Sequence, residues 1–253
     1  MASKITVPNP RYTWPHYSFV AHALGPAFLR LNGGFRVSGA ENVPATGPAL
    51  LCPNHVSYLD PPVVAMGFSR RTCFMAKKEL FGIPGLGPFI ARSYAYPVDR
   101  EEGGRQAIRT AVVLLKAGEL LVMFPEGTRS QDGELEQGKL GPAFIASRTG
   151  APIVPVAIWG TDVVLPLHTR RLYRCPVCIR YGEPMPAPRA DDGGRVAKKQ
   201  LNEYTLELMS GIRGLMDEIK AELPPQVLAR AERMKARWRQ IHADTATQPT
   251  EGD

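Results

Sequence analysis

The sequence ALLCPNHVSYLDPP, residues 49–62, joins an apolar run to a polar turn and a pair of prolines. Residues 49–52 predict a buried strand. Pro61 favours the first turn of a helix, where the missing N–H costs nothing. Asp60 precedes a proline, which disfavours helical geometry, so we expect it to cap this helix. The stretch therefore predicts a strand, a turn and a helix, with polar residues at the strand end, where α/β folds usually display catalytic groups.

The same alternation continues along the chain. It predicts an α/β fold with a mixed, largely parallel central sheet that is flanked by helices. Apolar runs predict further strands at residues 72–76, 95–98, 120–124 and 153–158, and an edge strand at 177–181. Helical spacing of apolar residues covers 104–117 and 140–148. Two more helical stretches follow a loop at 187–194 and are separated by Pro224 and Pro225.

The N-terminal residues have a different character. No charged side chain occurs between Tyr12 and Leu29, but prolines, glycine and histidines inside this stretch argue against a membrane span. Its aromatic and apolar side chains, with basic residues on both flanks, favour an interfacial helical segment that lies on a membrane surface. Docking of this segment on the core is an equally weighted alternative. The residues concerned are Trp14, Tyr17, Phe19, Val20, Leu24, Phe28 and Leu31.

These patterns divide the chain into four parts. Residues 1–38 form the membrane-associating segment, 39–186 the core, 187–243 the C-terminal helices, and 244–253 a disordered tail. In the last helix, Val227, Ala231, Met234, Trp238 and Ile241 form an apolar stripe beside several arginines. This stripe fits either packing on the core or a second membrane-surface helix.

Net charge and cysteine content indicate which classes of binding partner and which cellular setting suit this chain. The 253 residues carry a net charge of +7, which favours nucleic acid, an acidic membrane surface or a phosphorylated substrate. Four cysteines are too few for a disulfide scaffold and indicate a reducing, cytoplasmic setting. Cys175 and Cys178 have the spacing of half a zinc or redox site, but no second pair completes it, so we predict no metal.

His55 and Asp60 are the first candidate catalytic pair. Five residues separate them, so on a straight helix they would lie about 140° apart, and they meet only if the chain turns. In a dyad, the carboxylate fixes one ring nitrogen of the histidine and leaves the other as a base. The alternative is a polar turn with a helix cap.

A second candidate group is FPEGTRS, residues 124–130, which again follows a predicted strand. Gly127 permits an unusual turn or the close approach of a ligand. Arg129 offers a planar fork that suits two phosphate oxygens. The alternative is a surface turn with an incidental charge.

Together these two groups resemble the first and third motifs of the glycerolipid acyltransferases related to 1-acyl-sn-glycerol-3-phosphate acyltransferase. The resemblance extends from about residue 39 to 182. It includes segments around Lys77 and Arg100 and the run at 153–157. Tyr94 departs from the pattern, because the family's second motif usually opens with glycine; this departure affects the shape of the acceptor pocket.

The resemblance implies a fatty acyl transfer onto the sn-2 hydroxyl of 1-acyl-glycerol-3-phosphate, giving phosphatidic acid for phospholipid biosynthesis. The expected donor is acyl-carrier protein or acyl-coenzyme A, without a further cofactor, at the cytoplasmic face of the membrane. His55 would be the general base and Asp60 its orienting partner. The expected acceptor-binding residues are Lys77, Arg100, Glu126, Gly127, Thr128 and Arg129.

Other functions remain open at this point. The alternatives are another acceptor, either glycerol-3-phosphate or a larger lysophospholipid, and a protein that binds anionic lipid without catalysis. Serine hydrolysis through Ser57 or Ser130 is disfavoured, since the chain contains no Gly-x-Ser-x-Gly elbow. Nucleic-acid binding lacks a recognised reading motif.

Overall fold

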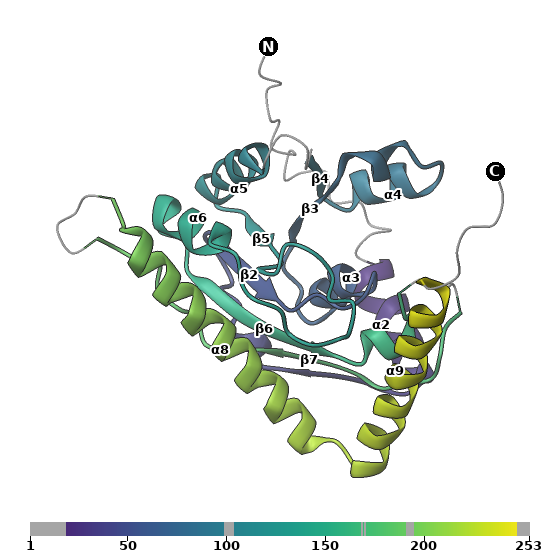
Figure 1. The fold of residues 1–253 in the computed structure, drawn as a ribbon. Coiled ribbons are helices and arrows are strands. Elements are labelled where there is room, and N and C mark those ends of the chain that lie inside the picture. The colour runs from purple at the N-terminus through teal and green to yellow at the C-terminus, as the bar shows by residue number, and fades with distance from the viewer. Residues whose placement is uncertain (1–18, 99–103, 168, 170, 191–194, 247–253) are drawn as a thin grey trace.

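The computed structural model describes residues 19–98, 104–167, 169, 171–190 and 195–246. A seven-stranded sheet forms its centre, in the order β1-β7-β6-β2-β5-β3-β4 (Figure 1). The strands are β1 (Phe35–Ser38), β2 (Ala49–Pro53), β3 (Cys73–Lys77), β4 (Ala95–Val98), β5 (Leu120–Val122), β6 (Ile153–Trp159) and β7 (Val177–Tyr181). Every residue of β2, β5 and β6 is buried, which explains why these strands read as continuous apolar runs.

Strand direction decides where the polar turns gather. β2 pairs in parallel with β5 and β6, and β3 pairs in parallel with β4 and β5. The carboxyl ends of these five strands therefore lie at one edge of the sheet. β7 is antiparallel to β6, while β1 is parallel to β7. The predicted mixed, largely parallel sheet is confirmed.

The edge of the sheet that contains β1 and β7 differs from the prediction. β7 is not an edge strand, because β1 pairs along its outer side. The strand β1 was not predicted, and it falls within the segment assigned to residues 1–38. Its four residues, FRVS, mix apolar and polar side chains that are only partly buried, so they form no apolar run.

Helices cover both faces of the sheet. The helices α5, α6 and α8 pack together, with α8 along β6 and β7 (Figure 1). On the opposite face, the Tyr181 hydroxyl from β7 donates to the Val64 carbonyl of α3 at 2.6 Å, and α2 packs against α3. The bounds are α2 (Gly25–Asn32), α3 (Asp60–Met66), α4 (Leu86–Arg92), α5 (Arg105–Lys116), α6 (Gly141–Thr149), α7 (Thr161–Val164), α8 (Lys198–Glu222) and α9 (Pro225–Ala246), with short turns η1 (Val20–Leu24), η2 (Ala40–Asn42) and η3 (Lys78–Gly82).

The two C-terminal helices meet in a sharp bend at the predicted proline break (Figure 1). The apolar stripe of α9 faces the protein: Ala231 is buried, and Val227, Met234 and Trp238 are half-buried. This contact favours the core-packing alternative for α9. The helix continues to Ala246, three residues into the predicted tail, and residues 247–253 lie outside the described part.

The N-terminal segment is described only from residue 19, so Trp14 and Tyr17 lie outside the described residues. In α2, Pro26 and Leu29 are buried, whereas Phe28 and Leu31 are exposed, as are Phe19 and Leu24 before it. Among the described residues, none of the helices is both long and apolar enough to cross a bilayer.

Candidate active site

His55 and Asp60 meet at the carboxyl end of β2. The Nδ1 atom of His55 lies 2.8 Å from Oδ2 of Asp60. An ionised carboxylate only accepts hydrogen bonds, so Nδ1 carries the hydrogen and Nε2 keeps its lone pair. No other described residue forms a hydrogen bond with the ring, and 14% of the His55 side chain is exposed. The pair therefore has the geometry of a base with its orienting partner.

The chain turns around the Asp60 carboxylate, which is fully buried. Its Oδ2 also accepts the backbone N–H groups of Val56 and Ser57, both at 2.7 Å, and this contact folds residues 55–60 into the turn that the dyad requires. The predicted helix cap is wrong, because α3 begins at Asp60 and the carboxylate points back into the turn instead. Asp60 acts as the centre of the loop rather than as a cap.

Thr161 completes the binding of Asp60. This residue opens α7 directly after β6, and its hydroxyl donates to Oδ1 of Asp60 at 2.6 Å. Both oxygens of the carboxylate are thus occupied, which fixes the plane of the group and through it the ring of His55. Thr161 was not among the predicted site residues, since 101 residues separate it from Asp60 and a lone threonine carries no signal.

The backbone and ring of His55 are held from β5 and the segment after it. The ring stacks on Phe124, with centroids 3.8 Å apart and planes inclined by 20°. The carbonyl of His55 accepts the N–H of Ser130 at 2.8 Å. Because β2 and β5 are neighbouring parallel strands, the two motifs that follow them form one site.

Glu126 supports this arrangement from inside the protein. Its Oε1 accepts the N–H of His55 at 2.7 Å, and its Oε2 accepts the N–H of Glu136 at 3.1 Å. Only 1% of Glu126 is exposed, and burial raises the pKa of its carboxyl to about 7. Glu126 therefore orients the His55 backbone, and no hydrogen bond or ion pair joins it to Arg129 among the described residues.

Gly127 and Lys139 lie next to each other. Gly127 has a φ of 73°, and a Cβ at this position would come within 2.7 Å of the Lys139 ammonium. Lys139 is tied to the same turn, because its N–H donates to the carbonyl of Pro125 at 2.8 Å. Its exposed side chain adds a positive charge beside the FPEGTRS turn. Lys139 was not among the predicted site residues, because a lone lysine in the stretch GELEQGKL, residues 133–140, carries no specific signal.

Arg129 lies half-buried over an aromatic ring. Its guanidinium carbon is 3.7 Å from the ring centroid of Tyr58, a cation–π contact with the residue three positions after His55. Its Nη1 is buried and has no hydrogen-bond partner in the described part of the chain. A buried guanidinium donor without a partner is costly, and an anionic ligand oxygen would satisfy it. Thr128, between Gly127 and Arg129, is exposed.

The remaining predicted residues lie farther along the same edge. Lys77 is the exposed last residue of β3, at the carboxyl edge with the other motifs. Arg100 follows β4 but lies outside the described residues. The strand order places β3 one strand beyond β5, so Lys77 extends the row of basic groups away from His55.

The two candidate serine nucleophiles have other partners. The Ser57 hydroxyl donates to the Leu165 carbonyl at 3.0 Å, and the Ser130 hydroxyl donates to Asp132 at 2.8 Å. Both serines are buried, with exposures of 0% and 1%. Neither hydroxyl is presented to His55, which argues against serine hydrolysis.

Tyr94, the departure from the family pattern, has a φ of 58°. Glycine adopts this left-handed region easily, whereas a tyrosine there is strained. The side chain is 6% exposed, and Arg71 lies 4.9 Å from its ring centroid. Burial and this cation–π contact offset the strain.

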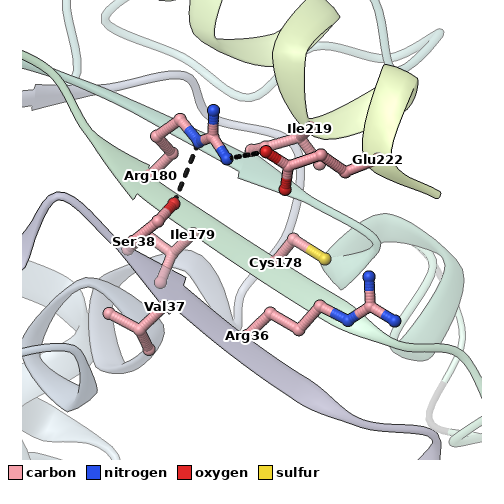
Figure 2. Close-up of a pocket in the computed structure, with 8 residues that line it drawn as sticks. All are labelled: Arg36, Val37, Ser38, Cys178, Ile179, Arg180, Ile219 and Glu222. Carbon is pink, nitrogen blue, oxygen red and sulfur yellow. Dashed lines mark hydrogen bonds and ion pairs between the residues drawn. The ribbon is translucent and has the colours of Figure 1, made fainter.

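Other features lie away from the dyad. A hollow of about 220 Å³ between β1, β7 and the end of α8 is lined by Arg180, whose guanidinium already binds Ser38 and Glu222 (Figure 2). The same guanidinium also donates to Glu218. Cys175 and Cys178 are free and buried, and burial raises their pKa values to about 12 and about 11. We therefore assign neither feature a role in the reaction.

Comparison with known proteins identifies a family. Residues 34–159 match the family model described as Acyltransferase. A 1-acyl-sn-glycerol-3-phosphate acyltransferase from Bacillus subtilis (strain 168) is 34% identical over 206 residues, which are 80% of this chain and 98% of that protein. A chloroplastic 1-acyl-sn-glycerol-3-phosphate acyltransferase from Arabidopsis thaliana is 34% identical over 143 residues, which cover 55% of this chain and 38% of the plant protein.

One solved structure is similar over most of the chain. The crystal structure of the 1-acyl-sn-glycerophosphate (LPA) acyltransferase PlsC from Thermotoga maritima matches with a TM-score of 0.68 and 30% identity, and the match covers 83% of this chain and 80% of the other. The sequence match to the bacterial enzyme and the shared fold agree. The chain therefore belongs to the 1-acyl-sn-glycerol-3-phosphate acyltransferase family.

Proposed function

We propose that this protein transfers a fatty acyl group from a thioester, carried by acyl-carrier protein or coenzyme A, to the sn-2 hydroxyl of 1-acyl-glycerol-3-phosphate. The product is phosphatidic acid. The observation that carries the proposal is the His55–Asp60 pair, whose Nε2 is open while Nδ1 is held at 2.8 Å. The relatives named above, which act on this acceptor according to their names, support the choice of substrate.

The chemistry follows from the two ring nitrogens. Nε2 of His55 takes the proton of the acceptor hydroxyl while the hydroxyl oxygen attacks the thioester carbonyl. Asp60 stabilises the imidazolium that forms, as its carboxylate lies against Nδ1. Collapse of the tetrahedral intermediate breaks the carbon–sulfur bond, and the departing thiolate receives the proton from Nε2. The reaction requires no cofactor beyond the thioester itself.

Arg129 is our choice for the acceptor phosphate. Its Nη1, which has no hydrogen-bond partner among the residues that the structure describes, and its position over Tyr58 favour an anionic ligand next to the dyad. Lys139, beside Gly127, and Lys77, at the end of β3, extend the positive charge along the same edge. Arginine holds two phosphate oxygens in one plane, so it determines where the acceptor hydroxyl lies relative to His55.

Replacing Arg129 tests this acceptor assignment. With 1-acyl-glycerol-3-phosphate, Arg129→Ala should lower kcat/KM by an amount consistent with roughly 1.5 to 3 kcal/mol, as for a hydrogen bond to a charged group. Arg129→Lys keeps the charge but loses the fork, so it should retain part of the affinity. With monoacylglycerol, which has no phosphate, both variants should match the wild type. The measurement is initial velocity with one radiolabelled acyl thioester and a panel of acceptors.

Arg213→Ala is the control, because Arg213 is exposed on α8 and forms no part of the proposed site. It should leave kcat/KM unchanged on every acceptor. An equal loss for Arg129→Ala with the phosphorylated and unphosphorylated acceptors would contradict the phosphate assignment. Higher wild-type activity with glycerol-3-phosphate or with a larger lysophospholipid would replace the proposed acceptor by that compound.

We also propose that the N-terminal helices place the protein on an anionic membrane surface at the cytoplasmic side, where a lysophospholipid is available. Phe19, Leu24, Phe28 and Leu31 are exposed by 57%, 52%, 44% and 81%, and the exposed Arg30 lies among them. Large apolar side chains that stand beside a basic residue on a short helix suit the boundary between headgroups and acyl chains.

Point substitutions test this surface better than a deletion, because Pro26 and Leu29 of the same helix are buried in the fold. The variant Phe28→Ser/Leu31→Ser should bind vesicles that contain anionic lipid at least about ten-fold more weakly, since two apolar side chains lose their burial in lipid. Salt should weaken wild-type binding. Co-sedimentation measures both effects. Leu206→Ser, a control at an exposed leucine of α8, should bind like the wild type; equal binding by the α2 variant would contradict the proposal.

A further inference from the structure

We propose that α9 is a brace that positions the catalytic dyad, with Lys235 acting on Asp60 through Asp162 and Thr161, and Arg239 holding the loop that binds the His55 backbone. This inference rests on the proposed function, in which His55 and Asp60 carry the reaction.

The first connection, from α9 to Asp60, runs through a largely buried ion pair. The ammonium of Lys235 lies 2.8 Å from Oδ2 of Asp162, and both side chains are only 12% exposed. Asp162 follows Thr161 in the single turn of α7, and Thr161 donates to Asp60 at 2.6 Å. A shift of this turn moves the Thr161 hydroxyl and with it the plane of the Asp60 carboxylate.

The ion pair is largely buried and lies beside a third segment of the chain. Burial raises the pKa of Asp162, and the charge of Lys235 opposes that rise. A Cβ built on Gly133 would lie 3.0 Å from the Asp162 carboxylate and 3.6 Å from the Lys235 ammonium, so the pair also contacts the loop after FPEGTRS. Loss of Lys235 would leave a carboxylate without its partner in a site that is mostly removed from water.

The second connection, from α9 to His55, runs through the loop at residues 130–134. Nε of Arg239 donates to the Asp132 carbonyl at 3.0 Å, and its guanidinium lies 3.7 Å from the Glu134 carboxylate. Asp132 accepts the Ser130 hydroxyl, and the Ser130 N–H donates to the His55 carbonyl. One helix is therefore linked to both members of the dyad, to Asp60 by way of α7 and to His55 by way of this loop.

Packing holds α9 in this position. Ala231 is 1% exposed, and the Trp238 ring meets that of Tyr173 edge-on at 5.2 Å. Lys235 and Asp162 line a hollow of about 20 Å³ together with Asn54 and Val56, the two neighbours of His55 in the chain. The helix thus lies next to the turn that carries His55, on the side of Asn54 and Val56. It forms no hydrogen bond with Nε2 of His55 among the described residues.

Substitution of Lys235 tests the brace in the full-length protein. Lys235→Met should lower kcat about ten-fold or more with little change in KM, because small misplacements of catalytic groups are costly to rate while the acceptor site is untouched. Amide exchange at residues 55–57 and 130–136, followed by mass spectrometry without substrate, should become faster. Arg237→Met removes the same charge from an exposed position of α9 and should change neither quantity.

A double variant separates positioning from stability. Asp162→Asn/Lys235→Met removes the unpaired carboxylate, so its melting temperature should recover relative to Lys235→Met. Its kcat should stay low, because Thr161 is still not held. Recovery of kcat together with the melting temperature, or unchanged exchange at 55–57 in Lys235→Met, would overturn the proposal. A wild type that acylates no acceptor would refute the proposed function instead, and the exchange measurement would still decide on the brace.

Discussion

His55→Ala is expected to lower kcat by about 10² to 10⁴, the usual contribution of a positioned general base. The acceptor hydroxyl is a weak nucleophile until its proton is removed, and Nε2 of His55 is the open nitrogen of the dyad. The thioester carbonyl is already reactive, so the loss should fall on activation of the acceptor. Initial velocity at saturating donor and acceptor measures this change.

The structure also defines a companion variant. The His55 ring stacks on Phe124, so alanine removes a packing contact as well as a base. His55→Gln fills more of that space but has no nitrogen of suitable basicity, and it should be as inactive as alanine while remaining closer to the wild type in stability. More than a tenth of wild-type activity in either purified variant would contradict general-base catalysis by His55.

Much of the sheet was predictable because its central strands are buried on both faces. Continuous apolar runs gave β2, β5 and β6 directly, and parallel direction then placed the turns after β2 and β5 at one edge. The strand β1 was not predictable from its residues. FRVS forms a strand because β7 offers it a partner, and pairing with a segment 142 residues away leaves no local pattern.

The site was predictable where one motif contains both partners. His55 and Asp60 lie within one turn, and the required bend follows from the two N–H groups that Asp60 accepts at Val56 and Ser57. Family resemblance identified Glu126 as a functional residue but not its role, because only the folded chain shows its oxygens on the His55 and Glu136 backbones. Thr161 and Lys235 depend on contacts between distant segments, which neither spacing nor periodicity encodes.

Asp60→Asn is expected to have an effect as large as the loss of the base, about 10³ to 10⁴ in kcat, as for the carboxylate of other dyads and triads. The carboxylate binds four donors: Nδ1 of His55, the N–H groups of Val56 and Ser57, and the Thr161 hydroxyl. An asparagine has one acceptor oxygen and one NH2 group, so it cannot satisfy all four.

Either orientation of the amide harms the site. If the NH2 group faces Nδ1, the histidine must accept there and carry its proton on Nε2, which removes the base. If the NH2 group faces the Thr161 side, the charge that stabilises the imidazolium is still missing, and the hydroxyl must turn to accept. A buried donor left without a partner costs about 1 to 3 kcal/mol, so the free energy of unfolding should fall as well.

The loss of kcat and the loss of stability in Asp60→Asn can be measured separately, because kcat per folded molecule is independent of the folded fraction. Asp217→Asn makes the same chemical change on the exposed face of α8 and should alter neither kcat nor the denaturation midpoint. Asp60→Asn should lower both, and the drop in kcat should persist under conditions where the variant is fully folded. Unchanged kcat per folded molecule would make Asp60 a scaffold for the turn alone, and catalysis would then depend on His55 without a charged partner.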